Sequence, residues 1–248
     1  MARGTSVRQA LIDAGLAQDR READALVMAG RVMVGERKAL KAGEPLPRDP
    51  GPLRILGGKG HGYVSRGGLK LAGALDTLRV DVAGLRCVDV GASTGGFVDC
   101  LLQRGAAGVV ATDVGYGLLA DKLRRDERVV VLERTHARSL QAGALPWPCD
   151  LLTADLSFIG LAALMPTLVG LVRPGGALLV MVKPQFEAAA HEVGEGGVVS
   201  DEAVRARVVA EVADAGQRAG ATWRGQAEAG VAGPSGNREV FVWLRRGS

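Results

Sequence analysis

Beyond residue 86, apolar positions follow two alternating patterns. Short continuous apolar runs, typical of strands buried on both faces, are separated by segments whose apolar residues recur at helical spacing. This alternation predicts an α/β fold, in which helices cover both faces of a mostly parallel sheet. The predicted strands are 87–90, 108–113, 128–132, 150–155, 176–183, 221–228 and 239–244, and the predicted helices are 95–104, 117–124, 161–172 and 201–218.

The first part of the chain has a different pattern. Apolar residues at helical spacing predict two short helices, over 6–15 and 20–30. The alternating segment 31–34 and the turn at Gly35 then predict a hairpin. Two helices followed by a hairpin make a small α+β unit.

Residues 45–62 are rich in Pro and Gly, and we interpret them as a linker with one short apolar piece inside it. After the linker, Ser65 is placed to cap a helix whose apolar stripe runs from Leu71 to Leu78. We therefore expect two domains, residues 1–60 and residues 61–248.

The positive charge of the chain lies in its first quarter. The net charge is +4, and residues 1–60 hold 11 Lys or Arg against 7 Asp or Glu, so the remainder is balanced. A local basic surplus suits an anionic partner such as nucleic acid, although a solvated surface explains a surplus of this size equally well.

Cysteine use and hydropathy favour a soluble cytoplasmic protein. The three cysteines form no CxxC or Cys/His pattern, so we expect neither a disulfide framework nor a metal site. The chain starts without an apolar signal core, and its longest apolar stretch, 161–172, falls short of the roughly 20 residues of a membrane span. We expect no membrane partner and a monomer.

The segment CVDVGASTGGF, residues 87–97, carries the strongest chemical signal. It predicts a strand, a glycine-rich turn and a helix start, whose free N–H groups suit a nucleotide-like ligand. Asp113 follows the next strand, where a carboxylate can bind ribose hydroxyls. Ser93 replaces the second glycine of the usual diphosphate-binding pattern, which argues against a dinucleotide. An ordinary tight turn is the alternative.

The same segment also reads G-x-S-x-G, the pattern of a hydrolase nucleophile elbow with Ser93 as nucleophile. A triad would then need a later histidine, and His191 is the candidate. The hydrolase interpretation requires several further features that the sequence does not support. We therefore interpret Ser93 as a turn residue that contacts the cofactor.

Charged residues also stand where an active site is expected. Asp155 and Lys183 end consecutive apolar strands, Glu239 opens the last strand, and Lys70 lies on the helix that begins the larger domain. Surface exposure is the default explanation for any single charge. Two charges at the ends of neighbouring central strands instead favour a shared site.

These segments resemble the TlyA (hemolysin A) family of ribosomal RNA 2′-O-methyltransferases, which have an FtsJ-like catalytic domain. The resemblance runs in order through nearly the whole chain. It rests on YVSRGGLKL at 63–71, DVGASTGGF at 89–97, DVGYG at 113–117, DLSFI at 155–159, VKPQFE at 182–187 and GNRE at 236–239.

The resemblance implies a Rossmann-like class I methyltransferase that uses S-adenosylmethionine and acts on ribosomal RNA or ribosomal subunits, with cytidine as the target. The family's Lys-Asp-Lys-Glu tetrad falls on Lys70, Asp155, Lys183 and Glu239. Its cofactor-binding positions fall on Gly91, Ala92, Ser93, Gly95, Gly96, Phe97, Asp113, His136 and Asp155. The first domain is similar to an αL-type RNA-binding domain, and the RNA-binding residues implied are Arg20, Arg21, Arg31, Lys59 and Arg66.

Several positions depart from the family's pattern, among them His136 and Asp19. His136 stands where relatives commonly have asparagine near the adenine end of the cofactor, and Asp19 stands where the RNA-binding module often has serine. In the expected mechanism Lys183 orients the ribose hydroxyl and, when deprotonated, takes its proton. Because a lysine amine ordinarily has a pKa of about 10.4, the base role requires desolvation or a neighbouring cation such as Lys70.

Two other functional classes compete with this interpretation. A membrane-lytic protein is suggested by the hemolysin name alone, and a catalytically silent RNA-binding protein would not need the four tetrad residues.

Overall fold

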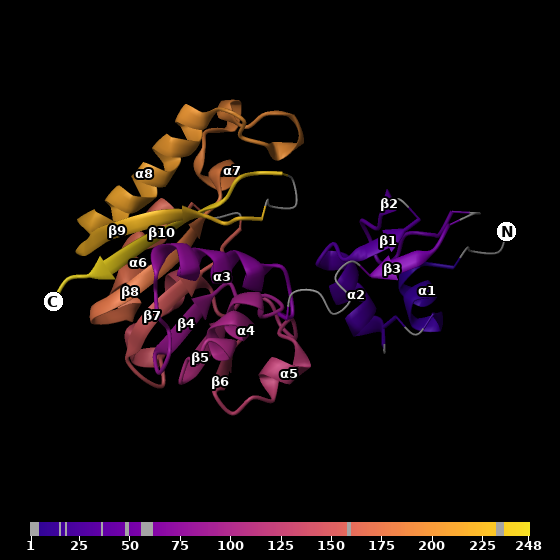
Figure 1. Cartoon of the computed structure of the whole chain (residues 1–248), viewed down its shortest axis with the longest axis horizontal. Helices are drawn as coiled ribbons and strands as arrows, with labels where there is room; N and C mark the ends of the chain where they lie inside the picture. The colour runs from indigo at the N-terminus through magenta and orange to yellow at the C-terminus, as the bar shows by residue number, and fades with distance from the viewer. Residues whose placement is uncertain are drawn as a thin grey trace. The chain divides into compact units, whose positions relative to one another are not determined.

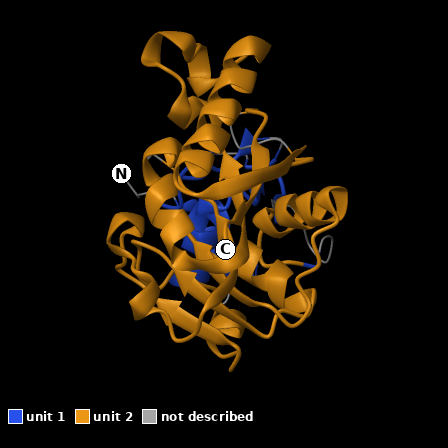
Figure 2. Cartoon of the chain, turned by 90° about the vertical axis from the view of Figure 1, so that its left-hand side faces the viewer, with its two compact units in different colours: residues 1–62 blue, residues 63–248 orange. Residues whose placement is uncertain are grey.

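The computed structural model describes residues 5–14, 16–17, 19–35, 37–47, 50–55, 62–157, 160–231 and 236–248. The chain divides into two compact units, residues 1–62 and residues 63–248 (Figure 2). Each unit has its own apolar core.

The smaller unit combines two helices, α1 (Val7–Asp13) and α2 (Arg20–Met28), with a three-stranded antiparallel sheet. Capping side chains begin both helices: Ser6 accepts a hydrogen bond from Gln9 N, and Asp19 accepts one from Glu22 N. Asp19 thus satisfies the helix N-terminus as a serine would.

The sheet of the smaller unit has the order β2-β1-β3, with β1 (Val32–Val34), β2 (Arg37–Lys38) and β3 (Leu53–Ile55). The predicted hairpin is present as β1 and β2. Strand β3 is the short apolar piece within the expected linker. The linker interpretation is wrong for these residues, because β3 pairs with β1 along its whole length and adds apolar residues to the core.

The larger unit contains a seven-stranded sheet in the order β6-β5-β4-β7-β8-β10-β9 (Figure 1). Only β10 runs antiparallel to its neighbours in this part of the described chain. The predicted mostly parallel sheet is confirmed. Its strands are β4 (Arg86–Val90), β5 (Gly108–Thr112), β6 (Val129–Leu132), β7 (Cys149–Ala154), β8 (Val172–Val182), β9 (Ala221–Glu228) and β10 (Val240–Arg246).

Helices cover both faces of this sheet. On one face α3 (Gly67–Leu78), α4 (Gly96–Gln103) and α5 (Asp121–Arg124) bury their apolar residues, and on the other face α6 (Leu161–Leu171) and α8 (Glu202–Arg218) do so. The short helix α7 (Pro184–Glu187) follows β8 directly. Burial of continuous Val and Leu runs from both sides explains why the strands lack polar alternation.

Two predicted details of these helices differ from the structure. Ser65 does not cap α3, because the helix begins after Arg66 without any side-chain cap, and Ser65 instead accepts from Gly68 N through its backbone oxygen. The helix predicted over 117–124 is reduced to α5, because side chains bind the backbone of the preceding loop, including Gly117 N, which donates to Glu133.

Candidate active site

The register of the sheet brings two tetrad residues together at one edge. Val240 of β10 pairs with Val182 of β8 in antiparallel register. The neighbouring residues, Glu239 and Lys183, therefore occupy facing positions where β10 begins and β8 ends. These residues are far apart in the chain, and only the pairing of the two strands makes them neighbours.

Three parallel strands, β4, β5 and β7, place further residues at the same edge. The last residue of β4, Val90, pairs with the last residues of β7 and β5. The residues that follow along these strands, Gly91, Asp155 and Asp113, therefore emerge side by side at the carboxyl edge of the sheet. That edge is where open α/β sheets bind their ligands.

Lys70 and Glu239 form a buried ion pair. Their Nζ and Oε2 atoms lie 2.5 Å apart, and the two residues are 8% and 2% exposed. Lys70 reaches this position from α3, which lies on one face of the sheet. Buried charges of either type are rare unless they are paired, so each of these residues depends on the other.

Lys183 has one ion-pair partner and one hydrogen-bond acceptor. Its Nζ lies 2.6 Å from Asp155 Oδ1 and donates a hydrogen bond of 2.8 Å to Ser157 Oγ. The side chain of Lys183 is 12% exposed and that of Asp155 is 28% exposed, so this pair is more open than Lys70–Glu239. The tetrad is thus two lysine–carboxylate pairs. Ser157 was not among the predicted site residues.

The glycine-rich turn after β4 has a backbone that suits few other residues. Gly91 and Gly95 have φ values of +86° and +94°, a region that side chains disfavour. A Cβ atom at Gly91 would lie 2.5 Å from Asp155 O, and one at Gly96 would lie 2.2 Å from Ser65 Oγ. These close approaches to the protein itself explain the glycines.

Ser93 is the exposed member of this turn. It has a φ of +49°, and its N–H donates to Asp113 Oδ2 at 2.9 Å. Ala92 and Phe97 are buried, and the Phe97 ring lies against Phe241 with centroids 5.7 Å apart. Contact between these two side chains and a cofactor stays a prediction, because both side chains contribute to the core.

Asp113 binds two neighbouring turns at the carboxyl edge of the sheet. Its Oδ2 atom accepts from Ser93 N and its Oδ1 atom accepts from Gly115 N at 2.7 Å. Each carboxylate oxygen has two lone pairs, so both oxygens keep an acceptor site for a ligand hydroxyl. The carboxylate thereby connects the turn after β4 to the turn after β5.

A second carboxyl group lies beneath the turn. Asp89 in β4 is 1% exposed, and its Oδ1 atom accepts a hydrogen bond of 2.7 Å from Thr153 Oγ1. Burial raises the pKa of Asp89 to about 8, the Thr153 hydroxyl opposes this shift, and the negative charges of Asp155 and Asp113 add to it. Asp89 was not among the predicted site residues, yet an aspartate inside an apolar strand was a usable signal.

His136 lies in the loop after β6 and is exposed. Its Nδ1 atom accepts from Arg138 N at 3.1 Å, which caps a short 3-10 helix, Ala137–Ser139. The neighbouring Glu133 binds Gly117 N at 2.8 Å and pairs with Arg124. These contacts order the loop after β6, while a role of His136 at the adenine stays a prediction.

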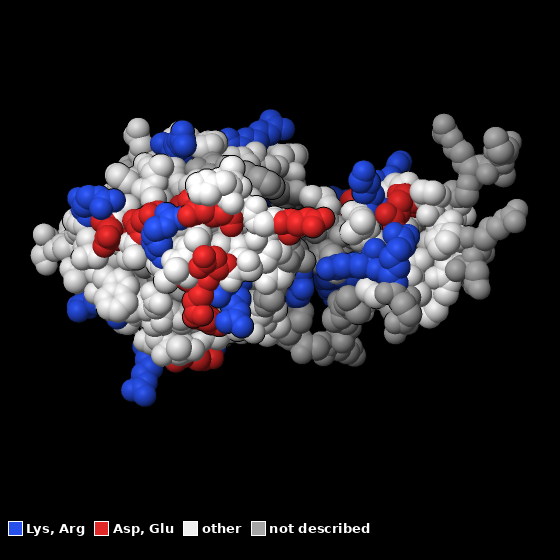
Figure 3. Space-filling view, turned by 90° about the horizontal axis from the view of Figure 1, so that it is seen from above, with Lys and Arg blue, Asp and Glu red and all other residues white. Residues whose placement is uncertain are grey.

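The predicted RNA-binding residues lie in both units. Arg20 and Arg21 are exposed in the first turn of α2, and Arg31 is partly buried just before β1. Arg66 precedes α3, whereas Lys59 lies outside the described residues. Basic side chains gather on the face of the smaller unit seen in Figure 3.

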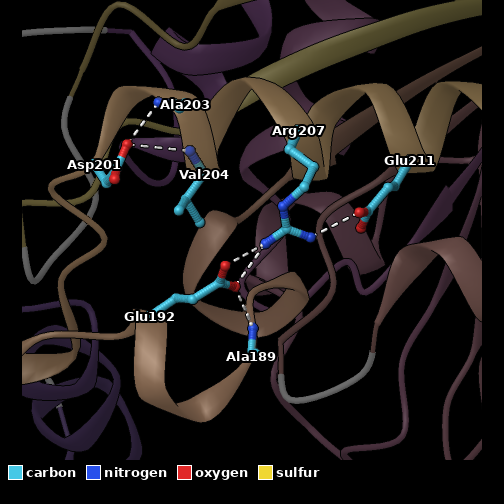
Figure 4. Close-up of polar contacts among 7 residues, drawn as sticks. All are labelled: Ala189, Glu192, Asp201, Ala203, Val204, Arg207 and Glu211. Atoms are coloured by element: carbon cyan, nitrogen blue, oxygen red, sulfur yellow. Dashed lines mark hydrogen bonds and ion pairs between the residues drawn. The ribbon is translucent and has the colours of Figure 1, made fainter.

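The loop between α7 and α8 is held by Asn237, which lies two residues before Glu239. Asn237 is 1% exposed, its Oδ1 atom accepts from Val199 N at 3.0 Å, and its Nδ2 atom donates to Gly197 O at 2.8 Å. The other side of the loop is attached to α8, because Arg207 binds both Glu192 and Glu211 (Figure 4). Asn237 was not among the predicted site residues either.

Metal sites and membrane spans are both absent from the described ranges. No group of His, Cys, Asp or Glu there is arranged to hold a metal ion, and Cys87, Cys100 and Cys149 are buried free thiols. No helix in the same ranges is long and apolar enough to cross a membrane.

Comparison with known proteins gives a consistent result. The family model for FtsJ-like methyltransferases matches residues 63–246. The chain is 48% identical over 245 residues to the "16S/23S rRNA (cytidine-2′-O)-methyltransferase TlyA" of Mycobacterium tuberculosis, covering 99% of this chain and 91% of the relative. It is 42% identical to the "Putative rRNA methyltransferase YqxC" of Bacillus subtilis, covering 94% of this chain and 83% of the relative.

Solved structures agree with these matches. A "Putative hemolysin from Streptococcus thermophilus" is 34% identical with a TM-score of 0.76, covering 100% of this chain and 90% of that one. A "putative hemolysin from Lactococcus lactis" is 38% identical with a TM-score of 0.72, covering 75% of this chain and 89% of that one. A methyltransferase family accounts for the segment that also reads G-x-S-x-G, so the hydrolase alternative is not retained.

Proposed function

Because the chain belongs to the FtsJ-like methyltransferase family, and within it to the TlyA (hemolysin A) family, we propose that it transfers a methyl group from S-adenosylmethionine to a ribose 2′-oxygen of ribosomal RNA. Two lysine–carboxylate pairs at one sheet edge carry this proposal. The name of the mycobacterial relative supports cytidine as the target nucleoside.

The residues at the carboxyl edge fit an adenosyl cofactor. Ser93 is exposed in the turn after β4, and Asp113 retains acceptor sites that suit the two hydroxyls of a ribose. We assign cofactor binding to the turn from Gly91 to Gly96 and to Asp113. When bound there, S-adenosylmethionine supplies a methyl group that its sulfonium already activates.

Lys183 is the residue assigned to the ribose hydroxyl. As an ammonium it would orient the 2′-oxygen by donating a hydrogen bond, and as a neutral amine it would take the hydroxyl proton as the methyl group passes from the sulfonium sulfur, left as a neutral thioether, to the oxygen. Asp155 holds the Nζ atom at 2.6 Å. Lys70 adds a positive charge at the same edge and Glu239 holds Lys70 in place. Most of the rate then comes from positioning.

The smaller unit is assigned to RNA binding. Its arginines Arg20, Arg21 and Arg31 would contact phosphates, and such contacts position an RNA without reading its sequence. We extend this assignment to Arg66 and, from the sequence alone, to Lys59. The description of the first 60 residues as an αL-type RNA-binding domain is part of the same proposal.

The test is transfer of radiolabelled methyl groups from S-adenosylmethionine to purified ribosomal subunits. We expect label in RNA with the wild-type protein and with Lys122→Met, and none above background with Lys183→Met. Lys122 is the matched control because it is a lysine of the same unit whose side chain is 56% exposed. Cofactor binding without label in either subunit or in free ribosomal RNA would contradict the proposed substrate, and absence of cofactor binding would contradict the reaction.

A further inference from the structure

The hydroxyl of Ser157 lies beside the amine that the proposed reaction uses. Ser157 belongs to the loop after β7, and Lys183 is the first residue after β8, the neighbouring parallel strand. Lys183 Nζ donates to Ser157 Oγ at 2.8 Å while it lies 2.6 Å from Asp155 Oδ1. One loop therefore supplies both an ion-pair partner and a hydrogen-bond acceptor to one amine.

A hydrogen bond fixes the rotation of a lysine amine about its Cε–Nζ bond. Nζ donates to Ser157 Oγ, whereas its 2.6 Å contact with Asp155 Oδ1 is an ion pair without hydrogen-bond geometry. With the Ser157 bond in place, the other two directions of the tetrahedral nitrogen are fixed in space, and each holds an N–H in the ammonium or can hold the lone pair in the neutral amine. If the Ser157 hydroxyl were absent, only the non-directional attraction of Asp155 would hold the amine, and the amine would rotate about Cε–Nζ.

We propose that Ser157 is a positioning residue that points one of the remaining directions of Lys183 Nζ at the ribose 2′-oxygen. This inference rests on the proposed function. Asp155 supplies the charge that holds the amine, and the Ser157 hydroxyl sets its rotation. The role requires a hydroxyl because a hydroxyl accepts from Nζ without adding a second negative charge.

A second contact between the same two loops supports this placement. Glu187 in α7 accepts a hydrogen bond of 2.6 Å from the N–H of Leu161, the first residue of α6. Ser157 and Leu161 thus both contact the segment that begins with Lys183. Ser157 itself is exposed, so its side chain is not needed to fill the core.

The kinetic test compares Ser157→Ala and Ser157→Thr with Ser200→Ala, an exposed serine outside the site. We expect Ser157→Ala to lower kcat by about 10- to 100-fold, because small errors in the placement of a reacting group have effects of this order. The KM values for S-adenosylmethionine and RNA should stay within about twofold, since neither is held by this hydroxyl. Ser157→Thr keeps the hydroxyl and should recover most of kcat, and Ser200→Ala should match the wild type.

A second measurement does not depend on methyl transfer. Lysine acetylation by a water-soluble reagent, followed by mass spectrometry, reports how firmly each amine is held. In Ser157→Ala the labelling rate of Lys183 should rise several-fold relative to that of Lys122 in the same molecule, and Ser157→Thr should restore it.

The outcomes separate the two proposals. An inactive wild-type protein that shows the labelling change would contradict the proposed function and, with it, the role toward the ribose, and would leave only the contact between Ser157 and Lys183 supported. Unchanged kcat and unchanged Lys183 labelling in Ser157→Ala would overturn the positioning role while an active wild type upholds the reaction. A raised KM for S-adenosylmethionine with unchanged kcat would also overturn it, because the hydroxyl would then serve the cofactor.

Discussion

Lys70 and Glu239 are separated by 169 residues in the chain, yet their charged atoms lie 2.5 Å apart in the interior. The pair joins a helix on one face of the sheet to the start of β10. It is both a part of the proposed site and a link between two elements that are distant in sequence.

Removing one partner of this pair should destabilise the protein strongly. Lys70→Met leaves the Glu239 carboxylate buried without its cation, and breaking a buried pair in this way costs about 3–5 kcal/mol. The double variant Lys70→Met/Glu239→Leu should recover most of the free energy of unfolding in urea, but no methyl transfer. Arg207→Met, which removes an exposed pairing with Glu192, should cost less than about 1 kcal/mol. If the loss of unfolding free energy in the double variant equalled the sum of the losses in Lys70→Met and Glu239→Leu, the two residues would not be energetically coupled.

Asp89 should make the stability of the protein depend on pH. Its pKa of about 8 in the folded protein exceeds the ordinary value of 3.8, so the folded state holds a proton that the unfolded state releases between these values. The contribution of Asp89 to the free energy of unfolding is therefore greatest below about pH 4. It falls by about 1.4 kcal/mol per pH unit as the pH rises to about 8.

Asp89→Asn is the variant that tests this dependence. The amide keeps an oxygen that accepts from Thr153 and has no proton to release. The difference in unfolding free energy between wild type and variant, measured in urea at pH 5, 6, 7 and 8, should shift steadily in favour of the variant. A constant difference across this range would show that Asp89 does not titrate there.

Glu187 should stabilise the start of α6. Its carboxylate accepts from Leu161 N, and this helix has no capping side chain of its own at Gly160. Glu187→Ala should lower the free energy of unfolding by about 1 kcal/mol, the usual cost of removing a cap. Glu195→Ala, a change at an exposed glutamate, is the control and should have almost no effect. Thermal unfolding of both variants decides the question.

The pKa of Glu187 is raised, mainly by burial and against the two backbone N–H donors. A raised pKa means that the stabilisation from this group is complete at low pH and declines as pH rises through the folded value. The destabilisation caused by Glu187→Ala should therefore be larger at pH 4 than at pH 7. The reverse order would contradict the direction of the shift.

Arginine removal in the smaller unit should weaken RNA binding in a salt-dependent way. If Arg20 and Arg21 contact phosphates, Arg20→Ala/Arg21→Ala should lower the affinity for ribosomal RNA. It should also reduce the slope of log affinity against log salt by roughly 1 for each phosphate that is no longer neutralised. The double variant Arg218→Ala/Arg224→Ala removes two exposed arginines of the larger unit and is the control. If the wild type and the two double variants gave equal slopes, Arg20 and Arg21 would not contact RNA phosphates.

The apolar pattern was sufficient to predict the strands of the larger sheet. Burial on both faces makes a central parallel strand a continuous apolar run, and β5 and β6 lie within one residue of their predicted bounds. Pairing over long separations was harder to predict. Leu53–Ile55 is too short to reveal itself as a strand, and its place in the sheet depends on contacts with Val32–Val34. The length of α5 likewise depends on side chains that bind the preceding loop.

The candidate site was likewise predictable from the sequence only in part. Charges at strand ends and the glycine-rich turn indicated the edge at which the residues meet. The sequence did not predict which lysine pairs with which carboxylate, because Lys70 arrives from a helix whose position depends on packing. Ser157 and Asn237 were missed as site residues for a similar reason, since a serine or an asparagine in a loop can bind many different partners until the chain is folded.

The position of β10 has a consequence for how the protein is made. This strand lies between β8 and β9, but it follows both of them in the chain. While a ribosome is still adding residues 229–239, β8 and β9 have no strand between them, and both present unpaired backbone groups. Insertion of β10 closes that gap and delivers Glu239 to Lys70 in the same event. Glu239 is therefore the last member of the tetrad to be synthesised, and a chain that ends before β10 has the other three members without being able to bring the four together.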